Sequence, residues 1–204
     1  MLKIIPLVVS YLLGSIPFGF IAVYLVKKKD IRSLGSGNIG ATNVTRVLGK
    51  EWGSLVFGLD FLKGFFSPLI VPFWVKDPPL YLFMLAAMFS VIGHNWTCFL
   101  KFKGGKGVAT SIGAICGLAV KSPVLFVVLS GAVVVWVLVF FISKIVSLAS
   151  LMSACSFLIF SFIAYFTAGL DLEFIVLSLL FFTFIILRHK NNIKNILSRK
   201  ELHF

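Results

Sequence analysis

Residues 124–142 read VLFVVLSGAVVVWVLVFFI and include no charged side chain. A helix needs roughly 20 mainly apolar residues to cross the hydrocarbon core of a bilayer, so this stretch is long enough to span a membrane. Seven apolar runs in all occur at about residues 4–26, 53–75, 79–97, 106–120, 124–142, 147–168 and 172–188. Because backbone groups in lipid must be hydrogen-bonded within their own segment, each run is predicted to be a helix.

The composition agrees with an all-α integral membrane protein that forms one transmembrane domain over residues 1–204. Hydrophobic residues make up 59% of the chain, above the roughly 45–50% of soluble domains. The formal net charge of +12 would suggest nucleic acid as the partner of a soluble protein. Here no soluble domain is left to carry a basic face, so nucleic acid is not expected. Three isolated cysteines, without a CxxC pair, are interpreted as packing residues.

Basic residues at the ends of the apolar runs indicate the orientation. The first run stops at three consecutive lysines, 27–29, and is interpreted as a retained span rather than a cleaved signal peptide. The fourth run is short and rich in small residues, so a re-entrant segment is the alternative to a span. If it spans, Lys3, Lys76 and Lys121 lie on one side and most other basic residues on the opposite side. The positive-inside rule therefore favours seven transmembrane helices, with the N-terminus outside and the C-terminus cytoplasmic.

Two polar glycine-rich stretches interrupt the apolar runs. The first glycine loop, Gly35–Asn43, reads GSGNIGATN, and Arg46 follows it. Glycine allows backbone amides to approach an anion closely. Hydroxyl and amide side chains donate hydrogen bonds to phosphate oxygens, and an arginine does so bidentately. This density of donors favours a phosphate site over an ordinary surface turn. A GxGxxG pattern is present, but no βαβ unit surrounds it, so a dinucleotide site is not predicted.

The second glycine loop, Lys103–Gly107, reads KGGKG and directly precedes the fourth apolar run. Free amides and partial positive charge at a helix N-terminus suit a phosphate, and Lys106 adds a full charge. The pattern is not a Walker A loop. A flexible, positively charged loop on the cytoplasmic side is the structural alternative.

Other polar residues are considered individually. His189 and Asn192 are three residues apart and would share one face if the last helix continued through them. His189 is a proton shuttle, a residue that positions a substrate hydroxyl, or an ordinary interfacial histidine. Asp60 and Lys63, inside the second run, are expected to pair with each other and with nearby backbone. His94 is expected to have a capping or interfacial role. No metal-ligand spacing or Ser-His-Asp order is present, so no metal or cofactor is predicted.

Several short motifs occur in an order that resembles the bacterial acyl-phosphate:glycerol-3-phosphate acyltransferases of the inner membrane. They are Gly14–Gly19, the first glycine loop with Arg46, Asp60–Gly64, Gly93-His94 running into Phe102–Thr110, Val146–Ser150, and His189 with Asn192. The resemblance covers the whole chain. The family usually has proline where Ile39 and Thr97 stand, which affects backbone stiffness but removes no donor or charge.

The resemblance implies transfer of a fatty acyl group from acyl phosphate to the 1-hydroxyl of glycerol 3-phosphate, giving lysophosphatidic acid and inorganic phosphate in membrane phospholipid synthesis. The resemblance implies that acyl-CoA is not the donor. The implied partners are both substrates and membrane lipid, with no obligatory protein partner. The active site would face the cytoplasm at the inner membrane.

The resemblance also implies the site residues. Residues at the reacting groups would be Ser36, Arg46, Lys106, His189 and Asn192. Substrate-binding residues would be Gly37, Asn38, Gly40, Thr42, Asn43, Gly104, Gly105, Gly107 and Ser150.

Two other functions are considered as alternatives to acyl transfer. A small anion transporter would place its site near the membrane midplane, at broken helices of an inverted repeat, whereas the donors here collect at one predicted face. A non-catalytic scaffold that binds anionic lipid would need no pair of glycine loops with this density of donors.

Overall fold

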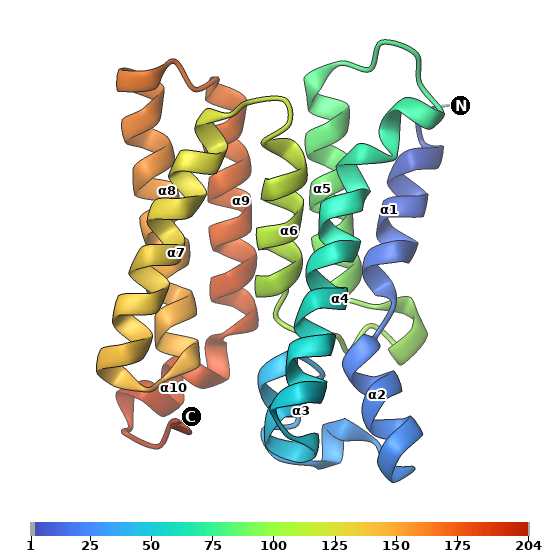
Figure 1. The fold of residues 1–204 in the computed structure, drawn as a ribbon, viewed down its shortest axis with the longest axis vertical. Coiled ribbons are helices and arrows are strands. Elements are labelled where there is room, and N and C mark those ends of the chain that lie inside the picture. Colours follow the sequence, from blue (N-terminus) through green and yellow to red (C-terminus); the bar gives the residue numbers. More distant parts are fainter. Residues whose placement is uncertain (1–2, 204) are drawn as a thin grey trace. The chain divides into compact units, whose positions relative to one another are not determined.

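The computed structural model describes residues 3–203, and the regular elements in that range are all helices (Figure 1). The α-helices are α1 (Ile5–Ser15), α2 (Phe18–Lys27), α3 (Ala41–Leu48), α4 (Lys50–Leu69), α5 (Leu80–Asn95), α6 (Val108–Leu118), α7 (Val124–Ser143), α8 (Val146–Ala168), α9 (Leu172–Arg188) and α10 (Lys190–Leu197). Short 3-10 turns occupy Ile31–Ser33, Val71–Phe73 and Cys98–Leu100. The chain forms two compact units, one up to Leu118 and one from Ala119 onwards.

The first apolar run is broken into α1 and α2 at Pro17, which has no backbone N–H to continue the helix. The carbonyls at the break find side-chain donors instead. Thr97 Oγ1 donates to the Ser15 carbonyl at 2.6 Å. Lys63 Nζ donates to the Ile16 carbonyl at 2.8 Å. Because an unsatisfied carbonyl is costly in a membrane, these two side chains stabilise the break.

Glycines allow the helices of the first unit to pack closely. A Cβ added at Gly113 of α6 would lie 2.0 Å from the Phe61 carbonyl oxygen of α4, and Gly117 lies one turn further along the same face. A Cβ at Gly14 of α1 would lie 2.0 Å from the Ser90 carbonyl oxygen of α5. Such small-residue contacts are the usual way in which helices associate in membranes.

Four helical stretches are long and apolar enough to cross a membrane: Ile5–Lys27, Leu80–Leu100, α7 and α8. A fifth is α9 together with α10, which bend by 63° relative to each other. The chain is therefore a multi-pass membrane protein. Helix α4 has 20 residues but carries Lys50, Glu51, Asp60 and Lys63. Helix α6 has 11 residues, about 16 Å of rise. The seven spans and the orientation of the termini remain predictions.

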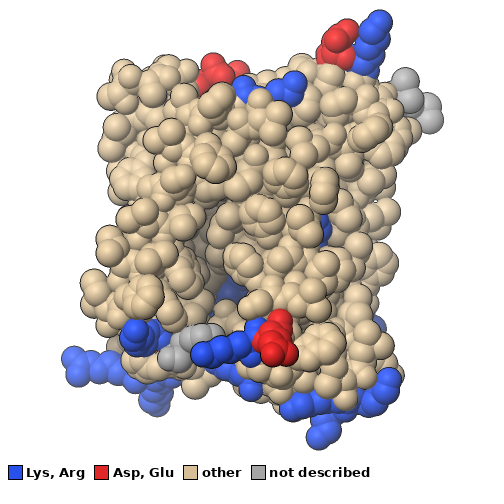
Figure 2. Space-filling model, viewed as in Figure 1, with Lys and Arg blue, Asp and Glu red and all other residues tan. Residues whose placement is uncertain are grey.

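In the second unit, α8 packs against both α7 and α9, and α10 contacts α8 and α9. The outer surface of α7 is apolar: Val127 is 73% exposed and Ile142 is 85% exposed. In Figure 2 the middle of each unit shows mostly uncharged atoms, whereas lysine and arginine gather at the α2–α3 end of the first unit and the α10 end of the second. An apolar belt with basic ends is typical of a membrane protein.

Candidate active site

The first glycine loop is shaped by one buried amide. Asn43, 1% exposed, accepts a hydrogen bond at Oδ1 from the Ser36 N–H at 2.8 Å. Its Nδ2 donates to the carbonyls of Leu34 at 2.9 Å and Asn38 at 2.8 Å. The side chain of Asn38 accepts from the Gly40 N–H at 2.8 Å. These bonds curl the loop around Asn43, and Ser36 stays exposed at its surface.

Helix α3 begins at Ala41, inside the predicted loop, and presents Arg46 at an exposed position. Lys27 Nζ donates to the Val47 carbonyl at 2.7 Å in the last turn of α3. Gly53 of α4 approaches α3 so closely that an added Cβ would lie 1.8 Å from Thr45 Oγ1. The helix that carries Arg46 is therefore held from both sides by α2 and α4.

An ion pair lies just before the first glycine loop. Arg32 Nη2 is 2.6 Å from Asp30 Oδ2. Charge-assisted hydrogen bonds from Arg32 hold the pKa of Asp30 below its usual value. The pair is partly exposed to solvent, so it organises the turn more than it stabilises the protein.

The two glycine loops lie at the same end of the first unit. Ile39 of the first loop and Leu100, just before the second, are buried in one apolar cluster that also contains Val23, Val44 and Val56. Figure 1 shows α3 and the connection between α5 and α6 at this end of the unit. The sequence predicted this proximity, and the shared cluster confirms it within the first unit.

The second glycine loop packs against the end of α5. The Gly105 N–H donates to the His94 carbonyl at 3.0 Å. A Cβ at Gly104 would lie 2.1 Å from the same oxygen. Gly107 has a φ of +78°, a left-handed value that favours glycine, and α6 begins at the next residue. The loop therefore leads into a helix N-terminus with Lys106 beside it, which is the arrangement that an anion site needs.

A cluster of ionisable side chains is buried next to this loop. Asp60 Oδ1 lies 2.8 Å from Lys63 Nζ, and Lys63 also binds the Ile16 carbonyl. The predicted pairing of Asp60 with Lys63 and with backbone is thus confirmed. His94 Nδ1 lies 3.6 Å from Asp60 Oδ1, and His94 is 5% exposed. The ring of His94 turns inward toward the ion pair, and the capping or interfacial role expected for this residue stays a prediction.

In the second unit, one carboxylate joins two separate helices. Glu201 Oε1 accepts hydrogen bonds from Ser147 Oγ at 2.7 Å and from Asn192 Nδ2 at 2.5 Å. Sequence reasoning missed Glu201, since a single acid in a basic tail shows no pattern. Ser150 is buried. Its Oγ donates to the Val146 carbonyl at 2.8 Å and accepts from Trp136 Nε1 at 3.2 Å.

His189 lies at the joint between α9 and α10. The last helix does not continue straight through Asn192, because α9 and α10 bend by 63° relative to each other at this point, so the condition for His189 and Asn192 to share one face is not met. His189 is 1% exposed, and its Nδ1 lies 2.8 Å from the Ile185 carbonyl oxygen. A carbonyl can only accept, so Nδ1 carries the proton. In a neutral ring, the lone pair is then on Nε2.

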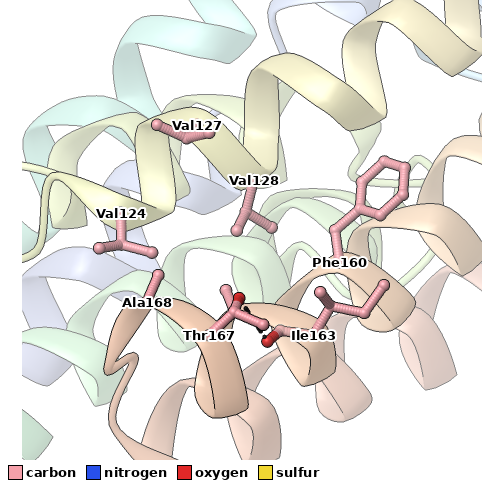
Figure 3. Close-up of a pocket in the computed structure, with 8 residues that line it drawn as sticks. Val124, Val127, Val128, Phe160, Ile163, Thr167 and Ala168 are labelled. Atoms are coloured by element: carbon pink, nitrogen blue, oxygen red, sulfur yellow. Dashed lines mark hydrogen bonds between the residues drawn. The ribbon is translucent and has the colours of Figure 1, made fainter.

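An apolar groove of about 380 Å³ lies between α7 and α8 (Figure 3). Valine side chains at 124, 127 and 128 face Phe160, Ile163, Thr167 and Ala168 across it. The groove is near the C-terminal end of α8, whereas Ser147 and Ser150 are near its N-terminal end. About 20 Å of helix separates the two regions, so the groove is not part of the polar site.

The fold and these loops define an all-helical, multi-pass membrane protein with donors suited to phosphate at one end of its first unit. Comparison with known proteins is more specific. A family model described as glycerol-3-phosphate acyltransferase matches residues 4–199. The glycerol-3-phosphate acyltransferase of Aquifex aeolicus is 41% identical over 197 residues, covering 96% of this chain and 95% of that protein. The Staphylococcus aureus (strain Newman) enzyme is 39% identical over 208 residues, covering 98% and 97%.

Two solved structures are also similar. Both are crystal structures of PlsY (YgiH), an integral membrane glycerol 3-phosphate acyltransferase. The glycerol 3-phosphate form has a TM-score of 0.85 and 38% identity, covering 99% of this chain and 95% of that one. The lysophosphatidic acid form has a TM-score of 0.83 and 37% identity, with the same coverage. The chain belongs to the glycerol-3-phosphate acyltransferase family.

Proposed function

We propose that this protein transfers a fatty acyl group from acyl phosphate to the 1-hydroxyl of glycerol 3-phosphate, giving lysophosphatidic acid and inorganic phosphate for membrane phospholipid synthesis. The observation that carries the proposal is the similarity, over 99% of the chain, to a structure of a glycerol 3-phosphate acyltransferase in its glycerol 3-phosphate form. The burial of Ile39 and Leu100 in one apolar cluster, which puts the two glycine loops at the same end of the first unit, supports it from the geometry.

The proposal includes a topology and a location. The chain is a single functional domain with seven spans, its N-terminus outside and its C-terminus in the cytoplasm. It sits in the bacterial inner membrane, and its polar site faces the cytoplasm. The excess of lysine and arginine in the connections on that side supports this orientation. Glycerol 3-phosphate would enter from water, while the acyl chain would stay in lipid between helices.

The reaction needs no covalent intermediate with the protein, because acyl phosphate is already an activated mixed anhydride. The glycerol oxygen forms a bond to the carbonyl carbon, the bond from that carbon to the phosphate oxygen breaks, and inorganic phosphate leaves. Orienting the two reactants is worth up to about 7–11 kcal/mol in favourable systems. One donor to the developing oxyanion is worth about 3–4 kcal/mol. A site of positioned donors is therefore sufficient.

The donors have distinct tasks in this proposal. Arg46 and Lys106, with the backbone of the glycine loops, bind the phosphate groups and the charge that develops during transfer. Ser36, exposed at the surface of the first loop, binds substrate directly. Asn43 contributes by shaping that loop, since its amide bonds the loop at three points.

The proposal also assigns substrate binding to two residues of the second unit. Asn192 and Ser150 would contact glycerol 3-phosphate. The bonds of Glu201 to Asn192 and Ser147 support a fixed orientation for the asparagine amide.

Two groups compete for the proton of the attacking hydroxyl. One is Nε2 of His189, which is the basic nitrogen if Nδ1–H donates to the Ile185 carbonyl. The other is a phosphate oxygen of the substrate. Either acceptor balances the reaction, because one proton leaves the hydroxyl and is released with the products.

The test uses protein purified into lipid nanodiscs, with palmitoyl phosphate and glycerol 3-phosphate as substrates and phosphate release as the measurement. Lys106→Ala should lower turnover at least about 10²-fold. Lys50→Ala removes an exposed lysine outside both loops and should keep most of the activity. Normal turnover in Lys106→Ala would reject the assignment of the loop. Phosphate flux into sealed vesicles without an acyl donor would favour a transporter instead.

A further inference from the structure

The buried cluster Asp60–Lys63–His94 lies directly beneath the second glycine loop. All three side chains are at most 5% exposed, although two belong to α4 and one to α5. Sequence reasoning gave these residues no part in the reaction. Their position next to the loop that carries Lys106 raises the question of what the cluster does.

The ring of His94 touches the loop directly. A Cβ built on Gly105 would lie 2.1 Å from His94 Nε2 and 3.0 Å from Cδ2 and Cε1. The backbone at Gly105 therefore lies against the imidazole, and a larger residue at this position would displace the ring. The main chain of His94 holds the loop as well, since its carbonyl accepts from the Gly105 N–H at 3.0 Å. His94 thus fixes Gly105, the neighbour of Lys106, through both its ring and its backbone.

The opposite edge of the ring faces Asp60. The distance of 3.6 Å between His94 Nδ1 and Asp60 Oδ1 is long for a hydrogen bond but short enough for electrostatic attraction in a buried site. Asp60 is itself fixed by Lys63 at 2.8 Å. Lys63 is anchored to the Ile16 carbonyl at the break between α1 and α2. A chain of polar contacts therefore leads from this break to the second glycine loop.

We propose that His94 is a positioning residue for the second glycine loop, and that Asp60, held by Lys63, orients the His94 ring. The inference rests on the proposed function, because its main consequence is the placement of Lys106 for acyl transfer. A misplacement of about 1 Å at a reacting centre can cost about 10²-fold in rate. Losing the ring should therefore affect turnover more than it affects binding of glycerol 3-phosphate.

The experiment measures kcat and KM per folded protein in nanodiscs. His94→Ala should lower kcat about 10- to 100-fold, with the KM for glycerol 3-phosphate changed much less. His94→Gln keeps volume and a donor at the ring position and should recover a large part of that loss. Ser90→Ala is the matched control, because Ser90 is also buried on α5 and, among the described residues, its Oγ donates within its own helix, to the Ala87 carbonyl. It should leave kcat close to that of the wild type.

The orienting role of Asp60 is tested by non-additivity. Asp60→Asn with Lys63→Gln removes both charges together, which avoids an unpaired buried lysine. In the wild-type background this pair should lower kcat. In the His94→Ala background it should cause little further loss, because Asp60 acts through His94. Losses that multiply would overturn the orienting role, and an unchanged kcat in His94→Ala would overturn the positioning role.

A second measurement separates this inference from the proposed function. Hydrogen exchange of the Lys103–Gly107 segment should be faster in His94→Ala than in the wild type and in Ser90→Ala. This readout needs no turnover. If the wild type lacks acyltransferase activity but the exchange rises, the proposed function fails and the positioning role stands. Unchanged exchange in His94→Ala would contradict the positioning role whatever the activity. If His94→Ala does not fold, the same comparison is made with His94→Leu, which fills space but carries no ring nitrogen.

Discussion

Replacing Gly113 by alanine should separate α4 from α6. The new Cβ would lie 2.0 Å from the Phe61 carbonyl oxygen, 2.8 Å from the Phe61 carbonyl carbon and 3.0 Å from the Phe65 nitrogen. All three are backbone atoms, so no side chain can rotate away. Ordinary contact begins at 3.4 Å, so the helices must move apart by about 1.4 Å. Overpacking of this kind costs about 1–3 kcal/mol.

The same change should reduce activity, because α6 begins immediately after Lys106 and Gly107. A shift of α6 by about 1 Å carries the second glycine loop with it, and a loss of about 10²-fold in turnover is expected. Gly58→Ala on α4 is the matched control, since a Cβ there meets nothing within 4 Å. Thermal unfolding in nanodiscs and phosphate release from palmitoyl phosphate measure the two effects. Wild-type stability and turnover in Gly113→Ala would refute the argument from close packing.

Three further predictions concern the loops and the histidine. Asn43→Ala removes three hydrogen bonds from the first glycine loop, each worth about 0.5–1.5 kcal/mol net; turnover should fall while circular dichroism stays helical, and full activity would contradict the shaping role. His189→Gln should abolish turnover if Nε2 takes the proton, whereas a retained rate would leave a substrate phosphate oxygen as the acceptor. Asp30 has a lowered pKa beside Arg32, so its pairing stabilises the fold above the unfolded pKa of about 3.9 and is lost as pH falls through the folded pKa. Asp30→Asn should accordingly be slightly less stable than the wild type at pH 7 and equal to it in strong acid; a difference that persists in acid would refute the ion-pair explanation.

Hydrophobic length predicted the long helices of the second unit well. The runs 124–142, 147–168 and 172–188 correspond to α7, α8 and α9 within one residue at each end. Because these runs are almost entirely apolar, their length alone is sufficient to predict where the helices begin and end. The break at Pro17 was not predicted, although proline was visible in the first run. Two distant side chains, Thr97 and Lys63, make that break tolerable, and only the packed structure brings them there.

The sequence indicates the two glycine loops of the candidate site but not the residues that support them in the structure. The glycine loops could be recognised from their composition, because they are rich in hydrogen-bond donors. Their position at one end followed from the predicted orientation of the helices. The contact of His94 with Asp60 depends on how α5 packs on α4, which no spacing reveals. The bonds of Glu201 to Ser147 and Asn192 depend on the fold of the C-terminal tail. Supporting residues of this kind show no sequence pattern, because their role depends on contacts that form only in the folded protein.

The most direct measurement of the central claim follows formation of lysophosphatidic acid by the wild-type protein in nanodiscs, together with release of phosphate from palmitoyl phosphate or of CoA from palmitoyl-CoA. Release from palmitoyl phosphate should require glycerol 3-phosphate and should yield one lysophosphatidic acid per phosphate. Palmitoyl-CoA should give no product. Equal use of both donors, or no phosphate release by folded protein, would contradict the assignment of this chain as an acyl-phosphate-dependent acyltransferase.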